Sequence, residues 1–286
     1  MDGEGVRGKR VVITGATGGI GLAAAEALAR DGALLSIVAR SQDRAAAAVS
    51  RIAQVAGGLS VDGLSADLAS QASVRTLAAE VLDRYPRVDV LVNNAGAINS
   101  RRQITEDGIE LTWAVNHLAP FLLTNLLLER LEQSGPARVV TTSSDAHRGA
   151  HIPFDDLNAE RSYGGRGFLR YGETKLANIL FTLELARRFE GIGVIANCFH
   201  SGFVVSGFNR NNGWLMSAGM ALTRPFARSP ERGADTLVWL VESADVADQS
   251  GGYYVDRTRR APTRAGQDIE AAGRLWEVSA EQTGLA

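Results

Sequence analysis

The chain has 286 residues, of which 45% are hydrophobic and 22% charged, and its formal net charge is −2. These values are ordinary for a soluble globular protein, and the near-neutral charge supplies no basic field for nucleic acid or an anionic membrane. We therefore expect a small-molecule partner. The single cysteine, Cys198, excludes an internal disulfide, favours a reducing compartment and is expected to pack inside a strand.

The sequence predicts a cytoplasmic protein of one domain, residues 1–286, with no membrane span. No apolar run reaches the length of about 18 residues that crosses a bilayer. The most apolar segment, 118–128, is interrupted by proline, threonine and asparagine. The N-terminus leads almost directly into the first predicted strand, which leaves no room for a secretory signal.

The first predicted element is a strand that breaks into a glycine-rich turn and then into a helix. The β-branched run at 10–14 favours a strand, and the alanine- and leucine-rich segment at 22–28 favours a helix. Glycines without a Cβ let a pyrophosphate approach the backbone, and a helix N-terminus offers it free N–H groups. We therefore predict dinucleotide binding here. The predicted contacts are Gly15, Thr17, Gly18, Gly19, Ile20 and Gly21.

Apolar strand-like runs then alternate with helical segments. Several runs are nearly continuous in apolar residues, as strands covered on both faces are. The alternation predicts an α/β fold: a single-domain, Rossmann-type, doubly wound parallel sheet of about seven strands flanked by helices. Segments 149–167 and 201–230 are irregular enough to be long functional loops. Further strands are predicted at 33–39, 59–64, 88–92, 138–142, 193–199 and 252–255, and helices at 42–56, 70–85, 108–131, 169–189 and 231–241.

The second predicted strand is followed by Arg40 and Ser41, which are candidate cofactor contacts. In dinucleotide folds an acidic residue near this position binds the adenosine ribose of NAD, whereas an arginine suits the 2′-phosphate of NADP. A guanidinium can bind phosphate bidentately, and no carboxylate stands beside it. The sequence therefore favours NADP(H), with a merely exposed strand-end arginine as the alternative.

The ends of the third and fourth predicted strands carry further candidates. Asp67 and Leu68 follow the third strand, where a polar side chain can meet the adenine, although Asp67 could equally serve the following turn. The fourth strand ends in two asparagines followed by Ala95 and Gly96. Such an end brings its backbone against a flat ligand, while the amide of Asn94 can tie strand ends together.

Four motifs follow one another along the chain: Thr14-Gly15-x-x-x-Gly19-x-Gly21, Asn93-Asn94-Ala95-Gly96, Ser143-Ser144 and Tyr171-x-x-x-Lys175. Together they resemble the short-chain dehydrogenase/reductase superfamily, and the resemblance covers nearly the whole chain. The segments 143–147, 154–157 and 171–178 are similar to the retinol dehydrogenase-like branch. The resemblance implies an enzyme that oxidises alcohols or reduces carbonyls, often on lipophilic substrates. Relatives often form dimers or tetramers, so a homodimer or homotetramer is an open expectation.

Tyr171 and Lys175 lie four residues apart at the start of a predicted helix, so they share a face and can touch one ligand. A free tyrosine titrates near about pH 10, and we expect a nearby ammonium to lower the pKa of Tyr171. Tyr171 would then give a proton to a carbonyl oxygen or take one from an alcohol. The resemblance implies that Lys175 also binds the nicotinamide ribose. A helix-surface pair is the alternative.

Ser144 and Asn116 complete the candidate catalytic group. Ser144 follows the fifth predicted strand, at the sheet edge where ligands of open α/β folds bind, and can hold the substrate oxygen. Ser143 competes for this role, and the resemblance favours the second serine. Asn116 is polar in an otherwise apolar helix, which is unusual. The resemblance implies that it kinks the helix and holds a water that passes protons to Lys175; a satisfied core amide is the alternative.

The segment after the sixth predicted strand departs from the family pattern at Ser201, where relatives usually carry a proline, so we expect a less rigid loop. Val204 and Ser206 still align with positions that hold the nicotinamide amide. Aromatic residues and methionines at 203–220 predict an apolar lid for a lipophilic substrate. A core helix or a subunit contact would explain them equally well.

The sequence as a whole therefore predicts an NADP(H)-dependent oxidoreductase. It would interconvert a carbonyl and an alcohol by hydride transfer, with Tyr171 as proton donor or acceptor. Reduction of a carbon–carbon double bond and non-catalytic dinucleotide sensing are the alternatives. No metal is expected, because His147 and His151 lie in a loop without a completing carboxylate. The arginines between 257 and 264 are expected to form a solvated surface.

Overall fold

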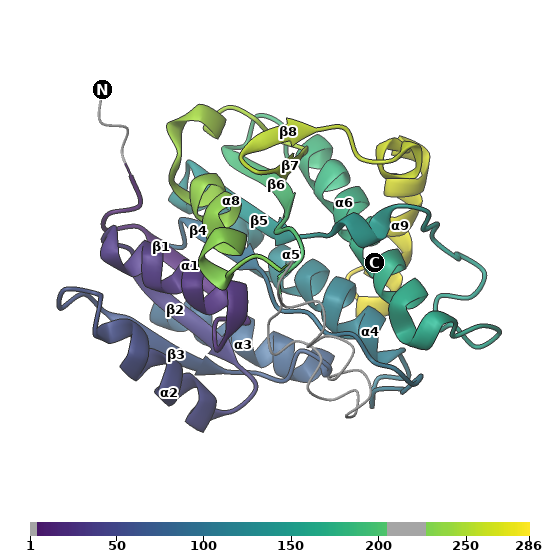
Figure 1. Cartoon of the computed structure of the whole chain (residues 1–286), viewed down its shortest axis with the longest axis horizontal. Coiled ribbons are helices and arrows are strands. Elements are labelled where there is room, and N and C mark those ends of the chain that lie inside the picture. The colour runs from purple at the N-terminus through teal and green to yellow at the C-terminus, as the bar shows by residue number, and fades with distance from the viewer. Residues whose placement is uncertain (1–4, 205–226) are drawn as a thin grey trace.

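The computed structural model describes residues 5–204 and 227–286 (Figure 1). In this part of the chain, eight strands form one sheet with the order β3-β2-β1-β4-β5-β6-β7-β8. All neighbouring strands are parallel except β7 and β8. The doubly wound sheet is confirmed, and β8 is an eighth strand that the sequence did not predict. The strands are β1 (Arg10–Thr14), β2 (Leu34–Ala39), β3 (Val61–Ser65), β4 (Val90–Asn93), β5 (Ala137–Thr142), β6 (Val194–His200), β7 (Gly252–Val255) and β8 (Thr258–Arg260).

The strand order reverses at β1. From β1 the chain runs outward through β2 to β3, and it then returns to place β4 on the other side of β1. The connections that leave β1 and β4 at their carboxyl ends therefore run in opposite directions, which is the point at which open α/β sheets form a ligand crevice. Ligands of open α/β sheets bind in such a crevice, so the fold directs attention to the ends of β1, β4 and β5.

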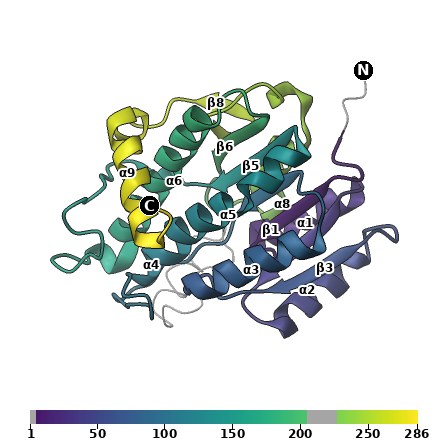
Figure 2. The same cartoon turned by 180° about the vertical axis from the view of Figure 1, so that it is seen from behind.

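Helices cover both faces of the sheet. α1, α2 and α8 lie on the face seen in Figure 1, and α3 and α5 lie on the opposite face, seen in Figure 2. Val11 and Ile13 of β1 pack in the core under α1, whereas Val12 packs in the core under α3 and α5. This burial on both faces explains the continuous apolar runs. The helices are α1 (Gly19–Arg30), α2 (Gln42–Ala53), α3 (Gln71–Arg84), α4 (Leu111–Trp113), α5 (Ala119–Ser134), α6 (Phe168–Arg188), α8 (Pro230–Glu242) and α9 (Ile269–Thr283).

The helix predicted at 108–131 is a composite of three parts. α4 leads into a π-helical turn, Ala114–Leu118, which continues as α5. Among the described residues, the stretch Leu111–Ser134 is the one helix long and apolar enough to cross a membrane, and 78% of its most apolar window is buried inside the protein. Packing against the sheet accounts for this apolar surface, so the stretch fits a core helix.

The C-terminal helix α9 was not predicted from the sequence. Its Trp276 packs against Phe121 of α5 at 5.0 Å and Phe181 of α6 at 6.0 Å between ring centres. The buried residues of α9 recur at helical spacing, from Ala272 through Leu275 and Trp276 to Ser279, so the pattern was present in the sequence. α9 therefore packs against α5 and against α6, the helix that carries Tyr171 and Lys175.

Candidate active site

The glycine-rich turn between β1 and α1 is shaped by close contact with the end of β4. Gly15 has a φ of +72°, and a Cβ there would lie 2.7 Å from the Cα of Ala95. A Cβ on Gly21 would lie 2.4 Å from the amide nitrogen of Asn94. Gly18, which caps α1, faces open space instead. The turn therefore leaves the N-terminus of α1 accessible, as a pyrophosphate requires.

Asn94 ties β1 to β4 as the sequence predicted. Its amide Nδ2 donates to the carbonyl oxygens of Thr14 at 3.0 Å and Gly15 at 3.2 Å. The Thr14 hydroxyl oxygen accepts from the backbone N–H groups of Asn94 and Ala95, both at 3.1 Å. Thr142 at the end of β5 donates to Asn94 Oδ1 at 3.3 Å. Three neighbouring strand ends are thus locked side by side, and Ala95 and Gly96 are half-buried directly after β4.

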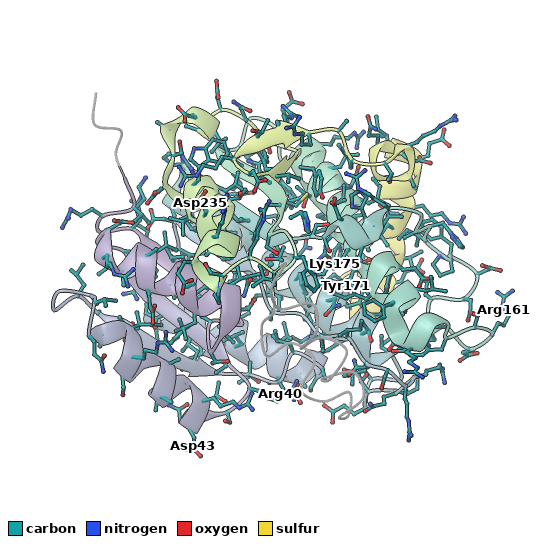
Figure 3. All side chains as sticks on the ribbon, in the orientation of Figure 1. Arg40, Asp43, Arg161, Tyr171, Lys175 and Asp235 are labelled. Carbon is teal, nitrogen blue, oxygen red and sulfur yellow. The ribbon has the colours of Figure 1, made fainter. Side chains whose placement is uncertain are left out.

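The residues that the sequence analysis expects near the adenosine lie between β2 and α2. Arg40 and Ser41 are exposed where β2 ends and α2 begins (Figure 3). Arg44, in the first turn of α2, is also exposed, and the sequence analysis missed it. Neither guanidinium forms a hydrogen bond or an ion pair with another described residue. Arg40 precedes the N-cap of α2 and Arg44 lies in its first turn, and guanidinium groups at such a place suit a phosphate group.

Asp67 and Leu68 both make local contacts, and their cofactor contacts stay predictions. One carboxylate oxygen of Asp67 accepts from the Ala69 N–H at 3.0 Å, and the Asp67 N–H donates to Ser73 Oγ at 2.9 Å. The turn role weighed for Asp67 is therefore present, while its side chain stays exposed. Leu68 is half-buried against the core under α3.

The structure separates the roles of the two serines after β5. Ser143 is buried, and its hydroxyl donates to the carbonyl oxygen of Lys175 at 2.8 Å. Ser144 is half-buried and accepts from the Ala146 N–H at 3.2 Å, and its hydroxyl lies near enough to Tyr171 to act on the pKa of the phenol. Ser143 thus braces α6, and Ser144 is the serine that stands beside Tyr171.

Tyr171 and Lys175 lie together on the second turn of α6 (Figure 3). The Lys175 ammonium is 5.4 Å from the centre of the Tyr171 ring and donates to the carbonyl oxygen of Thr142 at 2.9 Å. Asn178 Nδ2 donates to the same carbonyl at 3.1 Å. A Cβ on Gly172 would lie 2.6 Å from the carbonyl oxygen of Ala146, so glycine lets the Ser144 turn approach α6. The expected pairing is present.

The pKa of Tyr171 moves in the opposite direction to the sequence-based expectation. Burial raises it to about 12, with the nearby Ser144 hydroxyl acting the other way. Burial likewise lowers the pKa of Lys175 to about 8. Desolvation outweighs the opposing effect of Ser144 on the phenol, so Tyr171 is protonated at neutral pH. A protonated phenol is the form that can give a proton to a carbonyl oxygen.

Asn116 lies in the π-helical turn, fully buried. Its Oδ1 accepts from the Ala97 N–H at 2.7 Å, and its Nδ2 donates to the Ala97 carbonyl at 2.8 Å and to Thr174 Oγ1 at 3.0 Å. The helix distortion matches the expected kink, because π-helical turns widen the helix at this point. Both donor hydrogens of the amide are used within the protein, and the water-holding role remains a prediction.

The predicted nicotinamide loop is described only at its ends. Val204 forms a parallel bridge with Arg228, and its side chain packs at Gly233 of α8. Ser206 and the segment 205–226 lie outside the described residues. Val204 therefore lies beyond the end of β6, at the same carboxyl edge of the sheet as Ser144. The contact of Ser206 stays a prediction.

A buried ion pair links the two helices of the catalytic group, and the sequence analysis missed it. Arg170 and Glu110 are 1% and 0% exposed, with Nε and Oε2 2.8 Å apart. Glu110 also accepts from the N–H groups of Thr112 and Trp113, both at 2.9 Å, and so caps α4. The pair therefore joins the start of the helix that carries Asn116 to the residue before Tyr171.

No group of histidine, cysteine, aspartate or glutamate side chains suited to a metal occurs within the described ranges. His147 is buried and bonded within its own turn, and His151 is exposed. Cys198 is buried, and burial raises the pKa of its thiol to about 12, which fits a packing role. Of the C-terminal arginines, Arg257 pairs with Asp235, while Arg259 and Arg260 are exposed.

A doubly wound sheet with an open phosphate turn and a Ser144/Tyr171/Lys175 cluster at its carboxyl edge is the architecture of a nicotinamide dinucleotide oxidoreductase. A family model described as short chain dehydrogenase matches residues 9–155. The chain belongs to this family, and within it to the retinol dehydrogenase-like branch.

Three proteins illustrate the similarity. Human retinol dehydrogenase 13 is 39% identical, over 98% of this chain and 86% of its own. A Streptomyces sp. (strain C5) protein named after daunorubicin C-13 ketoreductase activity, DnrU, is 41% identical over 98% of this chain and 94% of its own. The crystal structure of a short chain dehydrogenase from Burkholderia cenocepacia J2315 in complex with NADP has a TM-score of 0.68 and 27% identity, covering 87% of this chain and 96% of its own.

Proposed function

We propose that this protein is an NADP(H)-dependent reductase of ketones or aldehydes on lipophilic substrates. The observation that carries the proposal is the placement of Ser144 next to a protonated Tyr171, beside Lys175, at the carboxyl edge of the sheet. This arrangement presents two hydroxyl groups to one substrate oxygen. The names of the human and Streptomyces relatives, which concern a retinol and a ketone, support the substrate class for those proteins.

In the proposed reaction Ser144 holds the carbonyl oxygen and Tyr171 donates the proton to it. NADPH, when bound, supplies the hydride to the carbonyl carbon. Lys175 lies behind Tyr171 and carries three N–H donors, of which one is used by the Thr142 carbonyl, so it can bind a ribose and help restore the phenol proton. The turn at 15–21 would hold the pyrophosphate, and Asn94, Ala95 and Gly96 would line the crevice.

The preference for NADP(H) rests on Arg40, with Arg44 beside it. Both side chains are exposed and without an ion-pair partner among the described residues, so no carboxylate competes with a 2′-phosphate for them. A Burkholderia relative binds NADP, which supports the same choice. A lipophilic substrate is supported by Phe168 and Leu169 at the start of α6 and by Phe203 after β6, which are 50%, 61% and 47% exposed.

The test is steady-state reduction of a panel of ketones, aldehydes and enones with NADPH and with NADH. We expect carbonyl reduction with NADPH preferred. Arg40→Ala should raise the KM for NADPH by about tenfold or more, the worth of one charge-assisted phosphate contact, and leave the KM for NADH nearly unchanged. Arg30→Ala, an exposed arginine of α1, is the matched control. Turnover of enones alone, or nucleotide binding without turnover, would replace the proposal by one of its alternatives.

A further inference from the structure

The turn that carries Ser144 is held by a buried histidine that the proposed reaction does not use. Residues Asp145–His147 form a short 3₁₀ turn capped by Ser144. The His147 side chain is 0% exposed, and its Nδ1 lies 2.6 Å from the carbonyl oxygen of Ser144. The same carbonyl accepts from the His147 N–H at 3.1 Å. The imidazole therefore fixes the main chain at the serine.

The other ring nitrogen of His147 fixes which tautomer is present. The backbone N–H of Thr263, in the segment before α9, donates to Nε2 at 3.3 Å. A backbone N–H can only donate, so Nε2 carries no proton and the single proton of the neutral ring sits on Nδ1. Nδ1–H then donates to the Ser144 carbonyl. Burial lowers the pKa of His147, which keeps the ring neutral.

The surroundings leave this turn little freedom. The ring of Tyr253 packs edge-on against His147 at 5.2 Å between centres, and its hydroxyl donates to Asp145 Oδ1 at 3.1 Å. On the other side, Gly172 permits the Ala146 carbonyl to lie directly against α6. A shift of the turn would therefore change the position of Ser144 relative to Tyr171.

We propose that His147 is a positioning residue, which holds the Ser144 hydroxyl in register with Tyr171 by donating from Nδ1 to the Ser144 carbonyl. Thr263, from the C-terminal segment, selects the tautomer that can donate. The inference rests on the proposed function of Ser144 and Tyr171. It adds a link from the C-terminal segment to the catalytic serine.

The test compares two amide replacements that each keep one half of the histidine. In His147→Asn the side-chain N–H₂ stands near the place of Nδ1 and keeps the donor to Ser144, while in His147→Gln the amide oxygen stands near the place of Nε2 and keeps the acceptor for Thr263. We expect His147→Gln to lower kcat for carbonyl reduction by about 10- to 100-fold, the effect of a misplaced catalytic group. His147→Asn should retain most of kcat, and both should bind NADPH like the wild type.

A second comparison separates positioning from general stability. In a Ser144→Ala background, His147→Gln should cause little further loss of kcat, because it acts through Ser144. Equal loss of kcat in the Asn and Gln variants, or a full additional loss in the Ser144→Ala background, would overturn the inference. If the wild type reduces no carbonyl, the proposed function itself fails, which is a different outcome from any pattern among the variants.

Thr263 provides a test that leaves His147 untouched. Thr263 has a φ of −59°, which proline adopts, so Thr263→Pro removes the N–H donor and places its ring carbon Cδ against Nε2 instead. Thr263→Ala keeps the N–H and is the matched control. We expect kcat to fall in the proline variant alone. Unchanged kcat in both variants would contradict the role of Thr263 in selecting the tautomer. This test can be made even if the His147 variants do not fold.

Discussion

Lys175 is buried at a cost to stability. Its side chain is 2% exposed, and its pKa falls from the ordinary 10.5 to about 8. Between these two values the unfolded chain binds a proton that the folded protein does not, so wild-type stability rises as the pH increases from 8 to 10.5. Below pH 8 the folded protein carries the full penalty of a buried ammonium.

We predict that Lys175→Met stabilises the protein at pH 7, by at most about 3 kcal/mol, and abolishes turnover. The Thr142 carbonyl keeps its hydrogen bond from Asn178 in the variant. The stability gain should shrink as the pH rises through 8 to 10.5. Denaturant unfolding of both proteins at pH 7 and pH 10.5 measures this, and a variant less stable than the wild type at pH 7 would contradict it.

The raised pKa of Tyr171 predicts different pH dependences for the two reaction directions. Reduction needs the phenol, which persists up to about pH 12, so its kcat should not fall between pH 6 and 8 through loss of this proton. Oxidation needs the phenolate, whose fraction grows tenfold per pH unit in this range. Initial rates in both directions across pH 6–9 test this. A decrease of alcohol oxidation with rising pH would be inconsistent with Tyr171 as the base.

The identity of these residues was predictable from the sequence, but their electrostatics were not. The four-residue spacing of Tyr171 and Lys175 placed them on one helix face, as observed. The direction of the Tyr171 pKa shift depends on how much water each group loses, and that is decided by elements distant in the chain. The close contact of Gly172 with Ala146 joins α6 to the turn that carries Ser144, and it could not be predicted from the sequence either.

At the scale of elements, the Glu110–Arg170 pair joins α4 to α6. Removing one partner leaves the other charge buried without compensation, which typically costs about 3–5 kcal/mol. We predict that Arg170→Met lowers the free energy of unfolding by this amount, and that the double variant Glu110→Gln/Arg170→Met recovers part of it. Chemical denaturation of the single and double variants measures the coupling.

The control is the exposed ion pair of Arg84 and Glu80, 2.9 Å apart in α3. Arg84→Met should cost less than about 1 kcal/mol, because exposed pairs contribute little. A loss for Arg170→Met as small as that for Arg84→Met would show that the buried pair does not join the two helices.

Element types followed from periodicity, whereas irregular features did not. The parallel strands and α1, α2, α3, α6 and α8 appear close to their predicted ranges. The π-helical turn depends on Asn116 bonding to Ala97, across 19 residues of chain, which no local pattern encodes. α9 was missed although its apolar stripe is regular, because its partners in α5 and α6 are far away in sequence.

At the scale of the whole molecule, two helical layers and one sheet bring four distant segments to a single edge. The turn after β1, the ends of β4 and β5, and the second turn of α6 meet there, while the C-terminal segment reaches the serine turn through His147. The cytoplasmic location and a homodimer or homotetramer stay predictions. Light scattering of the purified protein tests the second.

The account as a whole depends on Tyr171 as the proton donor to a carbonyl. The most direct measurement is single-turnover and steady-state carbonyl reduction by the wild type and Tyr171→Phe, with NADPH affinity measured on both. The account predicts that kcat falls by about 10²- to 10⁴-fold, the contribution of general acid catalysis, while NADPH affinity is kept. Turnover by the phenylalanine variant at a rate close to that of the wild type would contradict it.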